Sequence, residues 1–97
     1  MRPPRRRVDN TQADIVEAFR VAGASVWLTH HVGNGAPDLV VGWGLRVMFP
    51  VECKTGSEGL TLVEEAWHRE WRGVPVEVVR SPEEAISVLR RHIQGER

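Results

Sequence analysis

Two acidic residues and one lysine in the middle of the chain have the types and spacing of a metal-dependent hydrolytic site. Asp38 follows a proline, and only Cys53 separates Glu52 from Lys54. Because side chains alternate along a strand, Glu52 and Lys54 point to one face and Cys53 to the other, toward a core. Carboxylate oxygens suit Mg²⁺ or Mn²⁺, and such an ion lowers the pKa of a bound water and neutralises charge on a phosphate. The pattern predicts Asp38 and Glu52 as metal ligands and Lys54 as the group that orients the attacking water or stabilises the transition state.

A β-hairpin is the element that must bring Asp38 to Glu52. Residues 38–41 and 46–54 have the composition of strands, and residues 42–44 that of a hairpin turn. In an antiparallel hairpin the start of the first strand lies beside the end of the second. Pro50 cannot donate a ladder hydrogen bond, so we expect a bulge or an irregular edge near it.

These charges also fit a simpler interpretation, a surface salt bridge on two ordinary strands. The second strand contains Val47, Met48, Phe49 and Val51, so it should be buried. Charged residues on a buried strand need partners or a function, which favours the catalytic interpretation.

The rest of the chain alternates helices and strands. Apolar spacing predicts a helix over residues 11–22, a strand over 25–31, a helix from Thr61 to before Gly73, a strand over 76–79 and a last helix from Ser81. Three of these starts, at Thr11, Thr61 and Ser81, have the spacing of a capping box or its variant. Trp67 and Trp71 recur at i, i+4 and are most simply core residues.

This order predicts the fold class. Strands joined through a helix run parallel, whereas the hairpin strands are antiparallel. The expected class is therefore α/β (α+β), with a mixed four-stranded sheet flanked by helices.

Length and composition indicate a small globular protein. With 97 residues, 41% hydrophobic and 27% charged, the chain should form one domain. No apolar run approaches the roughly 20 residues of a membrane span, and none follows the N-terminus as in a secretory signal. The single cysteine, Cys53, excludes an internal disulfide. We expect a cytoplasmic protein without membrane contact.

The charges are unevenly distributed, although the formal net charge is zero. Four arginines fall within the first seven residues, so we divide the chain into a basic arm, residues 1–8, and a domain, residues 9–97. Arg5, Arg6 and Arg7 could contact a phosphate backbone without reading its sequence, and the same run also fits a solvated tail.

The histidines offer further contacts. His30 and His31 are adjacent in the predicted first strand, so they should point to opposite faces, one near the mouth of the cleft and one in solvent. We assign His31 and Asn34 to phosphate contact. A zinc site made from His30 or His31 with His68 is the weaker alternative.

Three segments resemble a known family. They are GAPDLVVG over residues 35–42, VECK over 51–54 and LTLVEEAWH over 60–68. Together they resemble the VRR-NUC-like phage branch of the PD-(D/E)XK nucleases, a group similar to Holliday-junction resolvases, over roughly residues 7 to 90. The resemblance implies a restriction-endonuclease-like αβββαβ(α) core. A phage-encoded relative would act in the cytoplasm of the host cell.

The resemblance also implies roles for individual residues. Asp38, Glu52 and the backbone carbonyl of Cys53 would bind Mg²⁺ or Mn²⁺, and Lys54 would serve catalysis. Gln12 matches a Glu or Gln in the family's first helix. Glu64 matches a Gln or Glu in the second helix, although a capping box alone also accounts for it.

The implied activity is structure-selective cutting of branched DNA, such as four-way junctions, by a homodimer. A competing hypothesis is a non-catalytic nucleic-acid-binding subunit that keeps the fold. Such a subunit has no need of Asp38, Glu52 and Lys54 together.

Overall fold

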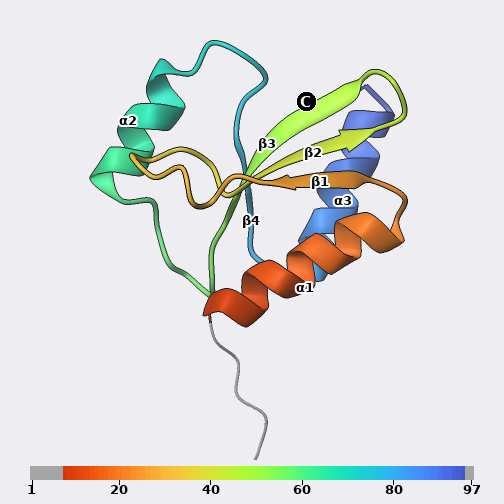
Figure 1. The fold of residues 1–97 in the computed structure, drawn as a ribbon, viewed down its shortest axis with the longest axis horizontal. Coiled ribbons are helices and arrows are strands. Elements are labelled where there is room, and N and C mark those ends of the chain that lie inside the picture. Colours follow the sequence, from red (N-terminus) through yellow and green to blue (C-terminus); the bar gives the residue numbers. More distant parts are fainter. Residues whose placement is uncertain (1–7, 96–97) are drawn as a thin grey trace, which may run out of the picture.

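A computed structural model of the chain describes the backbone of residues 8–95 and the side chains of residues 11–95. Figure 1 shows helices α1 and α3 side by side, with α2 standing apart from them. The elements are α1 (Val8–Val21), β1 (Ser25–Leu28), β2 (Leu39–Trp43), β3 (Val47–Cys53), α2 (Leu62–Glu70), β4 (Glu77–Val79) and α3 (Pro82–Ile93). This is the predicted order of helix, three strands, helix, strand and helix.

The four strands form one mixed sheet in the order β1-β2-β3-β4. β2 pairs antiparallel with both β1 and β3, whereas β3 and β4 run parallel. The predicted α+β class and the mixed sheet are therefore confirmed. No helix among residues 8–95 is long and apolar enough to cross a membrane.

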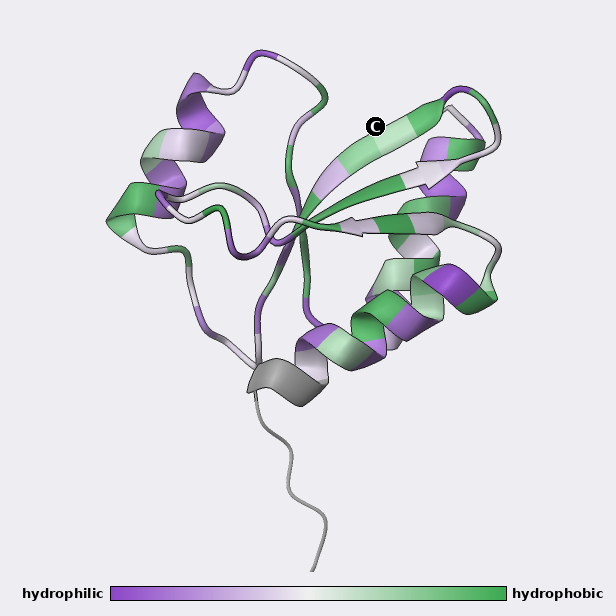
Figure 2. Cartoon of the chain, in the orientation of Figure 1, coloured by the Kyte–Doolittle hydropathy of each residue, from purple (hydrophilic) through white to green (hydrophobic). Residues whose placement is uncertain are grey.

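The core lies between the sheet and helices α1 and α3. Alternation along β2 buries Leu39 and Val41, and alternation along β3 buries Phe49 and Val51. The ring of Phe49 meets Phe19 of α1 edge to face, with centroids 6.0 Å apart. Figure 2 shows the corresponding hydrophobic colouring of the strands. The residues between these core positions consequently face the opposite side of the sheet.

Three predicted boundaries are wrong. β2 continues to Trp43, so Gly42 and Trp43 lie in the strand and not in the hairpin turn predicted over residues 42–44. Thr11 lies inside α1 and cannot be its N-cap. β1 ends at Leu28, so His30 and His31 lie in the turn that follows the strand. The expectation that the two histidines point to opposite faces of a strand therefore fails.

The proline in β3 also behaves differently from expectation. The β2–β3 register runs without interruption through Val40↔Pro50, so no bulge forms there. Pairing with β4 begins only at Val51, so Pro50 interrupts no pairing with β4. The irregularity lies on the other strand: the N–H of Asp38 donates to the Val51 carbonyl at 3.0 Å, although Val51 is the register partner of Leu39. Two residues thus oppose one, as in a β-bulge, directly at the predicted metal ligand.

Trp67 and Trp71 are not core residues. No residue of α2 is buried, and Trp71 is exposed. The two indoles stack on each other, with centroids 5.0 Å apart and an interplanar angle of 17°. The i, i+4 spacing identified an apolar face of the helix but not what that face packs against.

The start of α3 gives a first test of the fold. The Ser81 hydroxyl accepts from the Glu84 N–H at 3.1 Å, and Pro82 occupies the first helical turn, as predicted. The Glu84 carboxylate, however, accepts from the Arg80 N–H, so the reciprocal half of the capping box is missing. Ser81→Ala should lower the free energy of unfolding by about 1 kcal/mol in urea denaturation.

The matched control for this variant is Ser87→Ala, at an exposed position within α3. Alanine is the better helix former there, so this variant should match or slightly exceed the wild type. Equal losses from both variants would contradict the N-cap assignment.

Candidate active site

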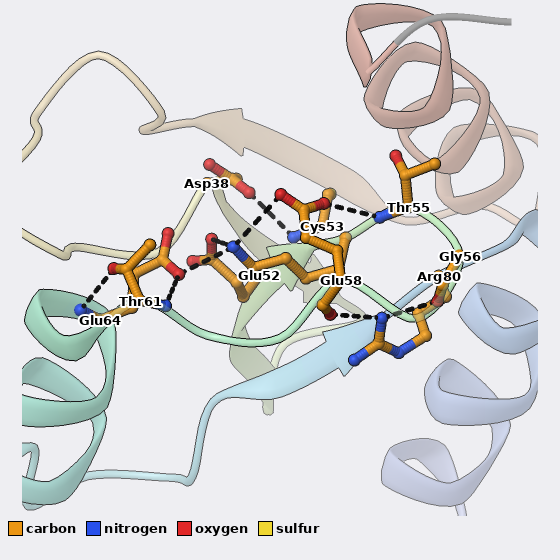
Figure 3. Close-up of polar contacts among 10 residues, drawn as sticks. Asp38, Glu52, Cys53, Thr55, Gly56, Glu58, Thr61, Glu64 and Arg80 are labelled. Atoms are coloured by element: carbon orange, nitrogen blue, oxygen red, sulfur yellow. Dashed lines mark hydrogen bonds and ion pairs between the residues drawn. The ribbon is translucent and has the colours of Figure 1, made fainter.

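One small cavity gathers all five residues that sequence analysis assigned to catalysis. Its volume is about 190 Å³. It is lined by Gln12 of α1, Asp38 before β2, Glu52 of β3, Lys54 after β3 and Glu64 of α2, together with Thr11, Cys53, Thr55 and Glu58. Four separate elements therefore converge on one polar cavity, whose central contacts are drawn in Figure 3.

Glu52 and Lys54 share a face of the sheet, and both are buried. Their exposed fractions are 2% and 5%, and Lys54 Nζ lies 3.8 Å from Glu52 Oε2. Burying an acid and an ammonium costs several kcal/mol of hydration, so such a pair is a weak source of stability. Cys53 packs against the core on the other face, as alternation along the strand predicts. The burial of this pair favours a functional over a stabilising explanation.

Asp38 is fixed by the backbone of the neighbouring strand. Its Oδ2 accepts a hydrogen bond of 2.8 Å from the Cys53 N–H. Burial raises the pKa of Asp38, although that hydrogen bond opposes the rise and the charge of Glu64 adds to it. The bulge at Asp38 and this hydrogen bond aim the carboxylate across the hairpin toward Glu52.

Glu52 carries the largest perturbation at the site. Burial, and after it the negative charge of Asp38, raise the pKa of Glu52 to about 9. Its Oε1 is buried without a hydrogen-bond partner among the described residues. The Oε1 side of this carboxyl group therefore lacks the partner that a buried polar atom normally has.

Lys54 is held by the acidic start of α2. Its Nζ lies 2.8 Å from Glu64 Oε1, and the same oxygen accepts from the Thr61 N–H at 2.9 Å. The Thr61 hydroxyl accepts from the Glu64 N–H in return, which completes the predicted capping box. Glu64 therefore caps the helix and also pairs with the buried lysine, so the two explanations of this residue are compatible.

The pKa values follow from this pairing. Burial alone would raise the pKa of Glu64, but the hydrogen bonds from Lys54 and Thr61 lower it to about 2. Burial alone would lower the pKa of Lys54, but Glu64 raises it above its usual value. The pair is thus ionised throughout the neutral range.

Glu64→Gln tests this pairing through pH. A carboxyl whose pKa falls from 4.5 to about 2 on folding adds stability above pH 4.5, and this stability is lost as pH falls through 2. The wild type should exceed the variant by about 2 kcal/mol at neutral pH, and the difference should vanish near pH 2. Urea denaturation across this range measures it. Glu65→Gln, at the exposed neighbouring position, is the control for the loss of one carboxylate from α2, and its stability should match that of the wild type.

Glu58 also lines the cavity, and sequence analysis missed it. Its Oε2 lies 3.9 Å from Lys54 Nζ, and its Oε1 accepts from the Thr55 N–H at 3.1 Å. Arg80 holds this loop by donating to the carbonyls of Gly56 and Glu58 at 2.8 and 2.7 Å (Figure 3). The only sequence signal was an acid four residues after Lys54, in the segment between the strand predicted over residues 46–54 and the helix predicted from Thr61.

The residues assigned to DNA contact are not gathered at the cavity. His31 and Asn34 are exposed in the β1–β2 connection and do not line it. His30 is the histidine beside the site, since its Nδ1 lies 3.2 Å from Gln12 Nε2. Arg5, Arg6 and Arg7 lie outside the described residues.

The donor set fits a hard divalent ion. Two carboxylates meet in the cavity, both with raised pKa values, and one buried oxygen of Glu52 lacks a partner. Among residues 8–95, no group of three or more His, Cys, Asp or Glu side chains is arranged to hold a metal. The alternative zinc site with His68 therefore finds no support in these residues. Mg²⁺ and Mn²⁺ need few protein ligands, because they keep several waters.

Comparison with solved structures identifies the fold. A solved structure described as a VRR_NUC domain matches with a TM-score of 0.67 and 27% sequence identity, over 88% of this chain and 96% of that chain. The chain has a VRR-NUC nuclease-like fold. No protein-family model and no curated protein matches the sequence. The resemblance seen in the three sequence segments is thereby confirmed for the fold, and the chain is a nuclease-fold domain.

Proposed function

We propose that this VRR-NUC nuclease-like domain is a Mg²⁺- or Mn²⁺-dependent endonuclease that hydrolyses DNA phosphodiester bonds. The observation that supports the proposal is the burial of Glu52 and Lys54 in one cavity with Asp38. A domain that only binds DNA gains nothing from burying an acid and an ammonium side by side.

Each residue of the cavity has a role in this proposal. Asp38, Glu52 and the Cys53 carbonyl would hold the ion, which when bound would supply a water of lowered pKa and neutralise developing negative charge. Lys54 presents its ammonium to the attacking water or to the phosphate oxygens. Glu64 and Gln12 have supporting roles. Glu64 fixes the position of Lys54, and Gln12 offers an uncharged contact at the cavity wall.

The finer parts of the proposal come from the resemblance to the phage branch. We propose branched DNA as the substrate, a homodimer as the active form and the host cell cytoplasm as its location. A single cavity of this size holds one scissile phosphate, so cutting two strands at once requires two copies.

The test is cleavage of labelled linear, flapped and four-way DNA with Mg²⁺, with Mn²⁺ and with chelator. The wild type should cut only with metal, whereas Lys54→Ala should bind DNA but cut at least about a hundredfold more slowly. Arg90→Ala, at an exposed position on α3, is the matched loss of a positive charge and should cut normally.

Four outcomes would separate the hypotheses. Cleavage in chelator, or unchanged cleavage by Lys54→Ala, would overturn the metal mechanism. Binding without cleavage of any substrate would favour the non-catalytic subunit. Equal cutting of linear and branched DNA would contradict the proposed preference for branched DNA and leave the proposed nuclease activity standing.

A further inference from the structure

Lys54 is the only lysine of the chain, and three carboxylates face its ammonium. Glu64 lies 2.8 Å from Nζ, which is the distance of a charge-assisted hydrogen bond. Glu52 and Glu58 lie at 3.8 and 3.9 Å, which is too far for a hydrogen bond. Because an ammonium has three N–H donors, Lys54 can still donate to an oxygen that comes closer on the side of Glu52 or Glu58.

The three acids differ in their exposure to solvent. The side chains of Glu52 and Glu64 have exposed fractions of 3% and 19%, whereas that of Glu58 is 47%. Glu64 is also fixed at the start of α2, since its carboxylate accepts from the Thr61 N–H. A substrate that arrives from solvent therefore reaches the Lys54 ammonium on the Glu58 side.

Arg80 fixes the backbone of the loop that carries Glu58. Its Nη1 donates to the carbonyls of Gly56 and Glu58 at 2.8 and 2.7 Å (Figure 3). Arg80 is itself held after the end of β4, because its N–H donates to the Glu84 carboxylate at 2.7 Å. The Glu58 N–H donates to the Thr55 carbonyl at 3.0 Å and closes a turn. The backbone of the loop is thus anchored, and movement is left to the Glu58 side chain.

The contacts of the Glu58 carboxylate are weak ones. Its Oε1 accepts from the Thr55 N–H at 3.1 Å, and its Oε2 faces Lys54. Ion pairs of a half-exposed side chain contribute little to stability. A change of rotamer breaks both contacts without disturbing the backbone of the loop. The carboxylate can therefore leave Lys54 at a small cost in free energy.

A phosphate oxygen of DNA and a carboxylate oxygen are both anionic acceptors for an ammonium N–H. Because they also repel each other, they cannot share the exposed side of Lys54. We propose that Glu58 is a gate: its carboxylate occupies the place beside Lys54 that a phosphate oxygen of the substrate takes, and its side chain swings out when the substrate binds. The identity of this substrate rests on the proposed nuclease function, whereas the closed state of the gate does not.

Steady-state cleavage of labelled DNA tests the gate. Glu58→Gln keeps the size of the side chain but removes the charge that competes with phosphate, so KM should fall about tenfold while kcat stays within about twofold. Glu70→Gln loses the same charge at an exposed position on α2 that does not line the cavity, and it should change neither constant. A fall in kcat at unchanged KM would mean that Glu58 takes part in the chemical step, and it would overturn the gate.

Amine labelling measures the gate without any cleavage, because Lys54 is the only lysine. The probe is pyridoxal phosphate, a phosphate monoester whose aldehyde condenses with an amine with loss of water. Borohydride reduction then fixes the label, and peptide mapping separates Lys54 from the terminal amine. The rate of labelling should rise about fivefold in Glu58→Gln, the factor that the loss of one partly exposed ion pair gives.

Arg80→Ala tests the anchor of the gate. This variant releases the loop that carries Glu58, so Lys54 should again be labelled faster than in the wild type. Arg90→Ala, at an exposed position on α3, is the matched control and should keep the wild-type rate. Circular dichroism checks that the variants are folded. Equal labelling of the wild type and Glu58→Gln would overturn the gate, and equal labelling of the wild type and Arg80→Ala would overturn the role of Arg80.

The gate and the nuclease function fail separately in these experiments. Faster labelling of Glu58→Gln in a protein that cuts no DNA would leave the closed gate standing and remove the nuclease function. Cleavage with the same KM in the wild type and Glu58→Gln would leave the nuclease function standing and remove the gate.

Discussion

Glu52→Gln is expected to abolish DNA cleavage and at the same time to stabilise the metal-free protein. An amide is a poor ligand for a hard divalent ion and brings no negative charge to it. Cleavage should fall by about a thousandfold or more, because the charge stabilisation of the transition state is lost with the ion. The same cleavage assay with labelled DNA measures this loss.

The stability gain follows from the raised pKa of Glu52. The carboxyl has an ordinary pKa of 4.5 and a folded value of about 9, so between these values the folded state binds more protons than the unfolded state. Stability of the wild type must therefore fall as pH rises through this window. Glutamine has no proton to lose, so in chelator the variant should exceed the wild type by about 2 kcal/mol at pH 9 and by little at pH 4.5.

Metal reverses the comparison. If Asp38 and Glu52 hold the proposed ion, Mg²⁺ should bind the folded wild type alone, raise its unfolding midpoint and leave that of Glu52→Gln unchanged. Glu70→Gln, at an exposed position on α2, is the control and should follow the wild type in both measurements. A variant that still gains stability from Mg²⁺ would show that Glu52 is not a ligand.

The sequence was sufficient to predict that Asp38, Glu52 and Lys54 lie together, because the local geometry of the strands and their hairpin determines this. Strand alternation places Glu52 and Lys54 on one face whatever the rest of the chain does. The hairpin then brings Asp38 beside them, because only a short turn separates the two strands. Family resemblance added Gln12 and Glu64, which come from helices whose docking no local pattern describes.

The features that the sequence could not predict depend on contacts between distant segments of the chain. Glu58 enters the cavity because Arg80, more than twenty residues later, holds the carbonyls of its loop. Trp67 and Trp71 show the same limitation differently. Their periodicity is that of a buried helix face, but within the described residues 8–95 no residue of α2 is buried.

Gly35→Ala is expected to separate α2 from the rest of the site. Gly35 has a φ of +84°, and an added Cβ would lie 2.5 Å from the carbonyl oxygen of Val63. The obstacle is helix backbone, which cannot rotate away like a side chain. Strain and clash together should cost about 3 kcal/mol or more in the free energy of unfolding.

Gly33→Ala isolates the strain from the clash. Gly33 has a similar φ of +78°, but nothing lies within 4 Å of its added Cβ. This variant should lose only about 1 kcal/mol, the cost of placing an L-residue in the left-handed region. Equal losses of unfolding free energy from the two variants in urea denaturation would mean that the close approach to Val63 does not contribute to the destabilisation.

The same contact connects the loop to the proposed catalytic lysine, and this is why the effect should extend beyond stability. Val63 precedes Glu64, whose carboxylate holds Lys54 at 2.8 Å. Moving the start of α2 away from Gly35 moves Glu64 away from the lysine. Asp38, three residues after Gly35, remains tied to Cys53. Under conditions where Gly35→Ala is folded, metal binding should therefore persist while cleavage falls, and Gly33→Ala should keep both.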